Sequence, residues 1–70
     1  HEIQYNLGVS YVNGEGVKQN VKEGARWIRL AADQGHASAQ YMLGNAYSHG
    51  RGVQQDYKEA VRLFRHLRLS

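Results

Sequence analysis

The sequence predicts an all-α protein, and more specifically an α/α solenoid of two helix-turn-helix repeats. Two observations lead to this fold class. The segment QYNLGVSYVNGEGV at residues 4–17 is nearly repeated as QYMLGNAYSHGRGV at residues 40–53, and apolar residues recur at helical spacing within each copy. A sequence period of about 20–50 residues is typical of arrays in which each unit buries its apolar face against the next. The chain is therefore expected to form one domain of stacked helical hairpins.

The copies define the two repeats, residues 1–36 and residues 37–70. When the chain is shifted by 36 positions, thirteen pairs of residues are identical. These pairs are Gln4/Gln40, Tyr5/Tyr41, Leu7/Leu43, Gly8/Gly44, Tyr11/Tyr47, Gly14/Gly50, Gly16/Gly52, Val17/Val53, Gln19/Gln55, Lys22/Lys58, Glu23/Glu59, Arg26/Arg62 and Arg29/Arg65.

The first helix of repeat one is predicted from an apolar stripe. Ile3, Leu7 and Tyr11 lie at i, i+4 and i+8, which indicates an amphipathic helix over about residues 2–13 with this stripe buried. Gly14 should end the helix, because glycine readily takes the positive φ of a helix C-terminus.

The second helix of repeat one begins with a capping signal. Asn20 is a predicted N-cap, and Glu23 follows at the spacing of a capping box, in which the carboxylate reaches back to a free backbone N–H. The helix is expected over about residues 20–34. Its predicted buried residues are Trp27, Ile28 and Ala31, and Gly35 closes it.

Repeat two carries the same signals and predicts helices over about residues 37–49 and 56–69. The corresponding residues are Ala39, Leu43, Tyr47, Gly50, Asp56 and Glu59. Gly8 and Gly44 occupy the same place inside the first helix of each repeat, where glycine costs about 0.5–1 kcal/mol relative to alanine. A cost accepted twice predicts a close crossing of two helices that leaves no room for a Cβ.

Residues 27–44 (WIRLAADQGHASAQYMLG) and 39–64 (AQYMLGNAYSHGRGVQQDYKEAVRLF) resemble the Sel-one-like repeat (SLR) family, a relative of the tetratricopeptide repeat. The similarity lies in the Ala-x-x-x-Leu-Gly-x-x-Tyr helix, the Gly-x-Gly-Val turn, the Asp-Tyr-x-x-Ala cap and the Trp…Ala-Ala-x-x-Gly-His-Ala exit. The resemblance implies a right-handed superhelix of A/B hairpins whose A helices line a concave face. It also implies an adaptor role in bacterial or eukaryotic protein complexes.

Four positions depart from the family pattern, and one of them is Val21, which replaces the usual tyrosine after the cap in repeat one. Gly24 replaces the usual alanine and is expected to loosen the second helix. Leu67 and Arg68 stand where repeat one has Ala31 and Ala32, the small residues that let a following repeat dock. Repeat two is therefore expected to be a divergent end of the array, without a third repeat after it.

The candidate partner-binding residues lie on the two A helices, off the buried stripe. They form columns at i, i+3/i+4 and i+7, where side chains align along a helix. The columns are Asn6, Val9, Ser10 and Asn13 in repeat one, and Met42, Asn45, Ala46 and His49 in repeat two. Such side chains suit an extended peptide, because asparagine pairs with peptide groups and methionine adapts to varied side chains. The alternative is ordinary solvated helix surface.

A basic column is predicted on the B helices. It contains Lys22, Arg26, Arg29, Lys58, Arg62, Arg65 and Arg68. A positive stripe attracts acidic proteins, anionic lipid or nucleic acid. The net charge is only +3, however, and Glu23, Asp33 and Glu59 lie among the basic residues. A solvated face is the favoured interpretation, and nucleic acid is not the expected partner.

Nothing in the sequence indicates catalysis, a metal or a cofactor. Ser10, Ser38 and Ser48 lack a recognisable nucleophile context, cysteine is absent, and the four histidines show no zinc-binding spacing. The Gly-x-Gly turns follow a helix rather than a strand, which argues against a phosphate-binding loop. No apolar run approaches the roughly 18 residues of a membrane span.

The leading hypothesis is a non-catalytic protein-interaction module, or adaptor, that binds a peptide or protein on its concave A-helix face. A small inhibitor or immunity-type protein is one version of it. The first alternative is a structural unit that self-associates through uncapped repeat ends, since about three repeats are usually needed for stability. The second is electrostatic binding of nucleic acid or anionic lipid. Both a cytoplasmic and a secreted or periplasmic location stay open.

Overall fold

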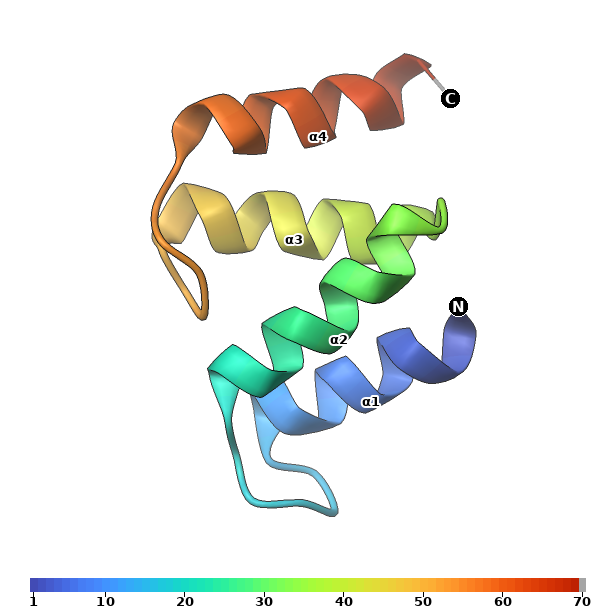
Figure 1. Cartoon of the computed structure of the whole chain (residues 1–70), viewed down its shortest axis with the longest axis vertical. Coiled ribbons are helices and arrows are strands. Elements are labelled where there is room, and N and C mark those ends of the chain that lie inside the picture. Colours follow the sequence, from blue (N-terminus) through green and yellow to red (C-terminus); the bar gives the residue numbers. More distant parts are fainter. Residues whose placement is uncertain (70) are drawn as a thin grey trace.

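The computed structural model describes residues 1–69, in which it contains four helices and no strand: α1 (Glu2–Asn13), α2 (Val21–Asp33), α3 (Ala37–His49) and α4 (Tyr57–Leu69). Consecutive helices pack against each other in a zigzag (Figure 1). The all-α solenoid prediction is confirmed, and each helix boundary lies within one residue of its predicted position. Ser70, the end of predicted repeat two, lies outside the described residues.

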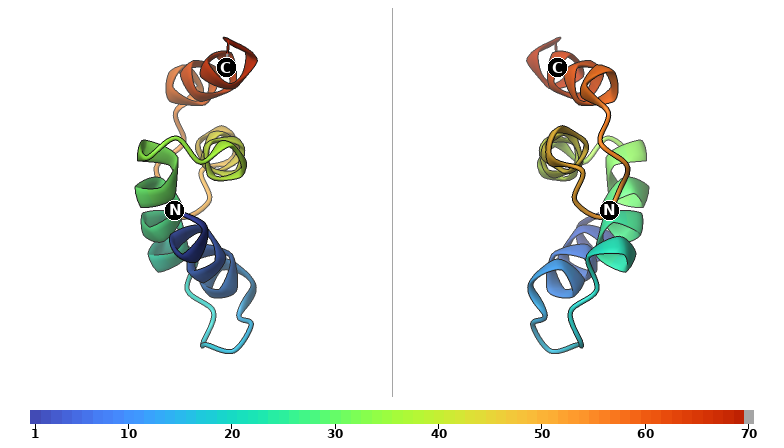
Figure 2. Two further views of the ribbon diagram at one scale, coloured as in Figure 1. Left: turned by 90° about the vertical axis from the view of Figure 1, so that its right-hand side faces the viewer. Right: turned by 90° about the vertical axis from the view of Figure 1, so that its left-hand side faces the viewer.

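The helices form two layers. Both A helices, α1 and α3, lie on the same side of α2, as the two side views show (Figure 2). α2 contacts both α1 and α3, so it joins the two repeats. The space between the A helices therefore has α2 as its floor.

Glycine ends both A helices, as predicted. Gly14 and Gly50 take the left-handed conformation, with φ of 73° and 65°. The N–H of Gly14 donates to the carbonyl of Ser10 at 2.7 Å. Gly16 and Gly52 also have positive φ. Both glycines of each Gly-x-Gly turn thus take a backbone conformation that residues with a Cβ rarely adopt.

The B helices begin with the predicted side-chain caps, but the capping box is only half formed. Asn20 Oδ1 accepts the N–H of Glu23 at 3.1 Å. The N–H of Asn20 donates instead to the Tyr11 carbonyl at 2.8 Å, and the Glu23 carboxylate pairs with Arg26 at 3.2 Å. The predicted return bond from Glu23 is therefore wrong, because the end of α1 already satisfies this N–H. Asp56, Glu59, Tyr47 and Arg62 repeat the arrangement in repeat two.

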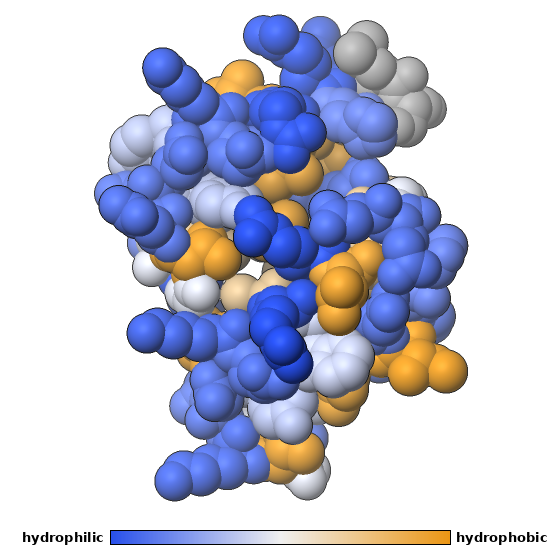
Figure 3. Space-filling model, in the orientation of Figure 1, coloured by the Kyte–Doolittle hydropathy of each residue, from blue (hydrophilic) through white to orange (hydrophobic). Residues whose placement is uncertain are grey.

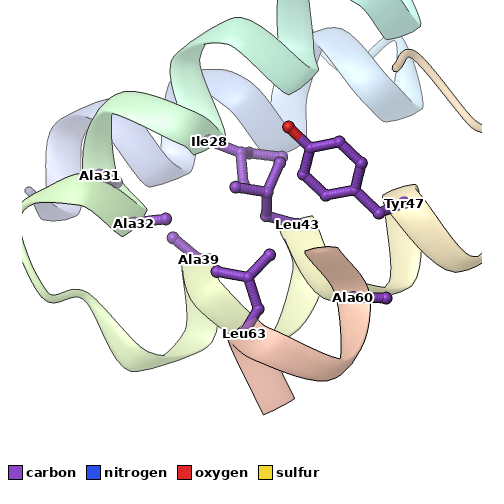
Figure 4. Packing of buried hydrophobic residues seen from close by; sticks show 8 residues of the cluster. All are labelled: Ile28, Ala31, Ala32, Ala39, Leu43, Tyr47, Ala60 and Leu63. Carbon is purple, nitrogen blue, oxygen red and sulfur yellow. The ribbon is translucent and has the colours of Figure 1, made fainter. Parts of the chain in front are cut away.

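The core lies at the junction of α2, α3 and α4. Ile28, Leu43 and Tyr47 point toward one another there (Figure 4). The cluster of buried residues also includes Ala31, Ala32, Ala39, Ala60 and Leu63.

The predicted stripes are buried unequally. The stripe of repeat two is fully buried, because α2 covers that side of α3. In repeat one, Leu7 and Tyr11 are half-buried, and the prediction that Ile3 is buried is wrong, since its exposed fraction is 82%. α2 covers the apolar stripe of α3, but within the described residues no helix covers Ile3 of α1 in the same way. Trp27, predicted to be buried, is half-buried.

The interior glycines mark close helix crossings, as predicted. A Cβ added to Gly8 would lie 2.5 Å from Ile28 Cγ1 and 2.9 Å from the Gly24 carbonyl oxygen. A Cβ on Gly24 would lie 2.7 Å from the Gly8 carbonyl oxygen. The expectation that Gly24 loosens α2 is therefore wrong. The absence of a side chain at Gly24 instead lets the backbones of α1 and α2 approach closely. At Gly44 the added Cβ would meet the ring of Phe64 at 2.7 Å.

Candidate functional site

The turn between the repeats holds the start of α1 against the start of α3. His36 Nδ1 accepts the N–H of Ala39 at 3.2 Å and so caps α3. An accepting Nδ1 leaves the proton on Nε2, which donates to Glu2 Oε2 at 2.8 Å. The ring of Tyr5 stacks on the imidazole, with centroids 4.7 Å apart. One half-buried side chain thus ties both A helices together.

Polar bonds between α2 and α3 hold the junction. Gln40 is a buried side chain whose Nε2 donates to the Ala32 carbonyl at 3.2 Å. The Arg29 guanidinium donates to the Tyr47 hydroxyl and lies over the Tyr47 ring. These bonds orient α3, and with it the predicted binding column of repeat two.

A hollow with a volume of about 210 Å³ lies between α1 and α3, with α2 as its floor. Its wall is mostly aliphatic, and its polar members are Asn45, His49 and Arg51. The apolar lining residues are Val12, Val21, Ala25, Ile28, Met42, Leu43 and Ala46. We call this space the concave hollow.

A second hollow of about 510 Å³ adjoins the first along α3. Met42 and Asn45 line both hollows. The other lining residues are Tyr5, Ala37, Ser38, Tyr41 and Leu67. The open side of α3 therefore forms one continuous recessed surface with Met42 and Asn45 at its centre.

The two predicted binding columns differ in their surroundings. All four residues of the repeat-two column, Met42, Asn45, Ala46 and His49, line the concave hollow. The repeat-one column lines neither the concave hollow nor the hollow that adjoins it: its members are Asn6, Val9, Ser10 and Asn13. That any of these residues binds a partner stays a prediction.

Sequence reasoning missed four residues of the hollow, namely Val12, Val21, Ala25 and Arg51. A signal for Arg51 was present, because the two turns are identical at both glycines and the valine and differ at Glu15 and Arg51. No local signal marks Val12 and Val21, since their position depends on how the repeats pack.

The basic column is partly engaged within the chain. Arg26 pairs with Glu23, Arg62 pairs with Glu59, and Arg29 contacts Tyr47. The face that α2 turns to the viewer in Figure 3 is mostly hydrophilic, with apolar patches between the helices. This arrangement fits a solvated face that carries local ion pairs.

In the part of the chain that the structure describes, no three His, Cys, Asp or Glu side chains lie together as a metal site would require. None of the helices there is both long enough and apolar enough to span a bilayer.

A family model of the Sel1 repeat matches residues 1–36 and 37–65. The chain belongs to the Sel1 repeat family. Sel1 repeats generally mediate protein interactions, and their fold is typically a non-catalytic scaffold.

Two solved structures of bacterial proteins are similar to this Sel1 repeat chain. A Sel1 repeat protein from Oxalobacter formigenes is 41% identical, with a TM-score of 0.91, over 94% of this chain and 27% of that one. A protective antigen of uropathogenic Escherichia coli strains, which displays an SLR fold, is 40% identical, with a TM-score of 0.91, over 96% and 14%. The Sel1 repeat chain thus spans a minor part of each structure. A comparison with the curated proteins found no match.

Proposed function

We propose that this Sel1 repeat chain is a non-catalytic adaptor that binds an extended segment of a partner protein along the open side of α3. The observation that carries the proposal is the recessed surface centred on Met42 and Asn45, which combines an aliphatic hollow with polar side chains. Such a combination is typical of recognition sites, where apolar contact supplies affinity and a few polar groups set orientation.

The chemistry of the surface supports a peptide ligand. The Asn45 amide offers both a donor and an acceptor, so it can pair with one peptide group of an extended strand. The flexible thioether of Met42 can adapt to different side chains. Because α3 is held by Gln40, Tyr47 and the His36 cap, binding would not require this surface to be ordered first. A small inhibitor that masks a partner is one biological form of this function.

Blocking the surface tests the proposal. We expect Asn45→Tyr to reduce the amount of partner captured from a lysate by roughly tenfold or more, because the larger side chain would obstruct the surface that both hollows share. The matched control is Asn6→Tyr, the same change on an A-helix surface that lines neither hollow. Mass spectrometry of the captured proteins gives the measurement, and circular dichroism shows that both variants fold. Equal capture by the two variants would contradict the proposal.

Self-association is a second candidate, favoured by the exposed end of repeat two. Tyr5 is half-buried beneath His36, whereas the equivalent Tyr41 has an exposed fraction of 58%. Val61 is 53% exposed, although the equivalent Ala25 is buried. A second copy of the chain could cover this apolar end.

A charge on this end tests self-association. We expect Val61→Glu to convert a dimer or larger species to the 7.9 kDa monomer, because burying an unpaired carboxylate is strongly unfavourable. Lys58→Glu is the control, since it places the same side chain at another exposed position of α4. Analytical ultracentrifugation measures the mass. A wild-type chain that stays monomeric at about millimolar concentration would rule out this candidate.

A further inference from the structure

The edge of the concave hollow near the second turn is basic. Arg51 lines both the concave hollow and a neighbouring hollow over the Gly50–Gly52 turn, and Lys22 lines the latter. His49 also lines the concave hollow. No aspartate or glutamate is among the residues that line either space. The lining of the apolar hollow therefore includes one charged side chain, that of Arg51, with Lys22 in the neighbouring hollow.

Arg51 and Lys22 do not stabilise the described part of the fold through ion pairs. Within residues 1–69, neither Arg51 nor Lys22 forms an ion pair, although other basic residues of the chain do. Both side chains are exposed. Their charges are thus available to a ligand.

Repeat one shows that the turn does not need an arginine. The position equivalent to Arg51 is Glu15, whose carboxylate accepts a hydrogen bond from Asn13 at 3.3 Å. The backbone N–H of each residue makes the same bond, from Glu15 to Ser10 at 3.0 Å and from Arg51 to Ala46 at 2.9 Å. Since either charge is compatible with this turn, local structure does not explain the basic residue beside the hollow.

The volume of the hollow limits what can enter it. Pockets for whole small molecules usually measure about 300–1,000 Å³, and the concave hollow is smaller, at about 210 Å³. Its wall is aliphatic apart from the polar edge. A single large apolar side chain, projecting from a peptide that lies along α3, fits both the volume and the chemistry.

We propose that the partner segment is acidic: an apolar side chain enters the concave hollow, and a neighbouring aspartate or glutamate pairs with Arg51, with Lys22 close by. This inference rests on the proposed function, because it names the class of peptide for the same surface. Charge complementarity at the edge selects the segment, and burial of the apolar side chain supplies most of the affinity.

End-blocked peptides with a central leucine or phenylalanine flanked by glutamates are the probe, so that only side chains carry charge. Otherwise identical peptides flanked by glutamine or by lysine are the comparison. Each is titrated into the ¹⁵N-labelled chain, and the amide signals of Asn45, Ala46 and Arg51 are followed. We expect the glutamate peptides to shift these signals with an affinity roughly 1.5-fold to fivefold higher than that of the glutamine peptides, the range of one exposed ion pair. The difference should shrink as salt is added.

A charge swap assigns the preference to Arg51. We expect Arg51→Glu to lower the affinity for the glutamate peptides and to raise the affinity for the lysine peptides. Lys58→Glu on α4 should change neither affinity. The turn should tolerate Arg51→Glu, because repeat one has glutamate at this position.

The outcomes separate the two proposals. If all three peptide sets shift the same amides equally, the acidic preference is wrong and binding on the concave face stands. If the shifted amides lie elsewhere, or if no glutamate peptide produces shifts at about millimolar concentration, the acidic preference fails. The Asn45→Tyr capture experiment then decides the proposed function independently.

Discussion

Replacing Ile28 by alanine should lower the free energy of unfolding by about 2–5 kcal/mol, the usual range for removing a large buried aliphatic side chain. Ile28 is 2% exposed. It packs against Leu43 and Tyr47 of α3 on one side and faces Gly8 of α1 on the other. A 70-residue domain has a total stability of only about 4–10 kcal/mol. The variant should therefore lose a large fraction of the stability of the chain.

Urea unfolding measures this effect, with the ellipticity at 222 nm and the fluorescence of Trp27, the single tryptophan, as probes. Leu30→Ala is the matched control, because it removes the same number of carbons from the same helix at a position that is 41% exposed. We expect Leu30→Ala to lower the free energy of unfolding much less than Ile28→Ala does. If the two variants have similar midpoints, α2 does not join the repeats in the way the core indicates.

Gly8→Ala should also destabilise the chain, by about 1–3 kcal/mol, although alanine is the better helix former. The added Cβ would meet both the Ile28 side chain and the Gly24 carbonyl, at 2.5 and 2.9 Å. A backbone carbonyl cannot move without shifting the whole helix. The gain of about 0.5–1 kcal/mol in helix propensity does not offset that displacement.

Gly44→Ala, the same change at the equivalent position, should be milder than Gly8→Ala. Its nearest neighbours are atoms of the Phe64 ring, which is half-buried at the end of the array and can turn aside. Thermal unfolding of the two variants under identical conditions measures the difference. If Gly8→Ala proves as stable as the original chain, α1 and α2 are not packed as closely as the structure shows.

The repeat sequence by itself determined the class of fold, the four helices and their ends. These are local properties: the apolar period, the Gly14 and Gly50 turns and the Asn20 and Asp56 caps act within one or two helical turns, and the structure confirms them. The Gly8 crossing was also predictable, since a destabilising residue repeated at one place indicates a steric requirement.

The tertiary structure alone decided which surfaces are open and which are buried. Equivalent positions of the two apolar stripes differ in burial. Ala39 is covered by α2, whereas the equivalent Ile3 has no helix over it in the described part of the chain. Gly24 was expected to weaken α2, but it forms a close contact with α1, because the packing of the two helices decides its role. The concave hollow likewise exists only where Val12, Val21 and Arg51 from separate segments meet α3. Burial depends on which neighbour is present, and helical periodicity carries no information about the neighbour.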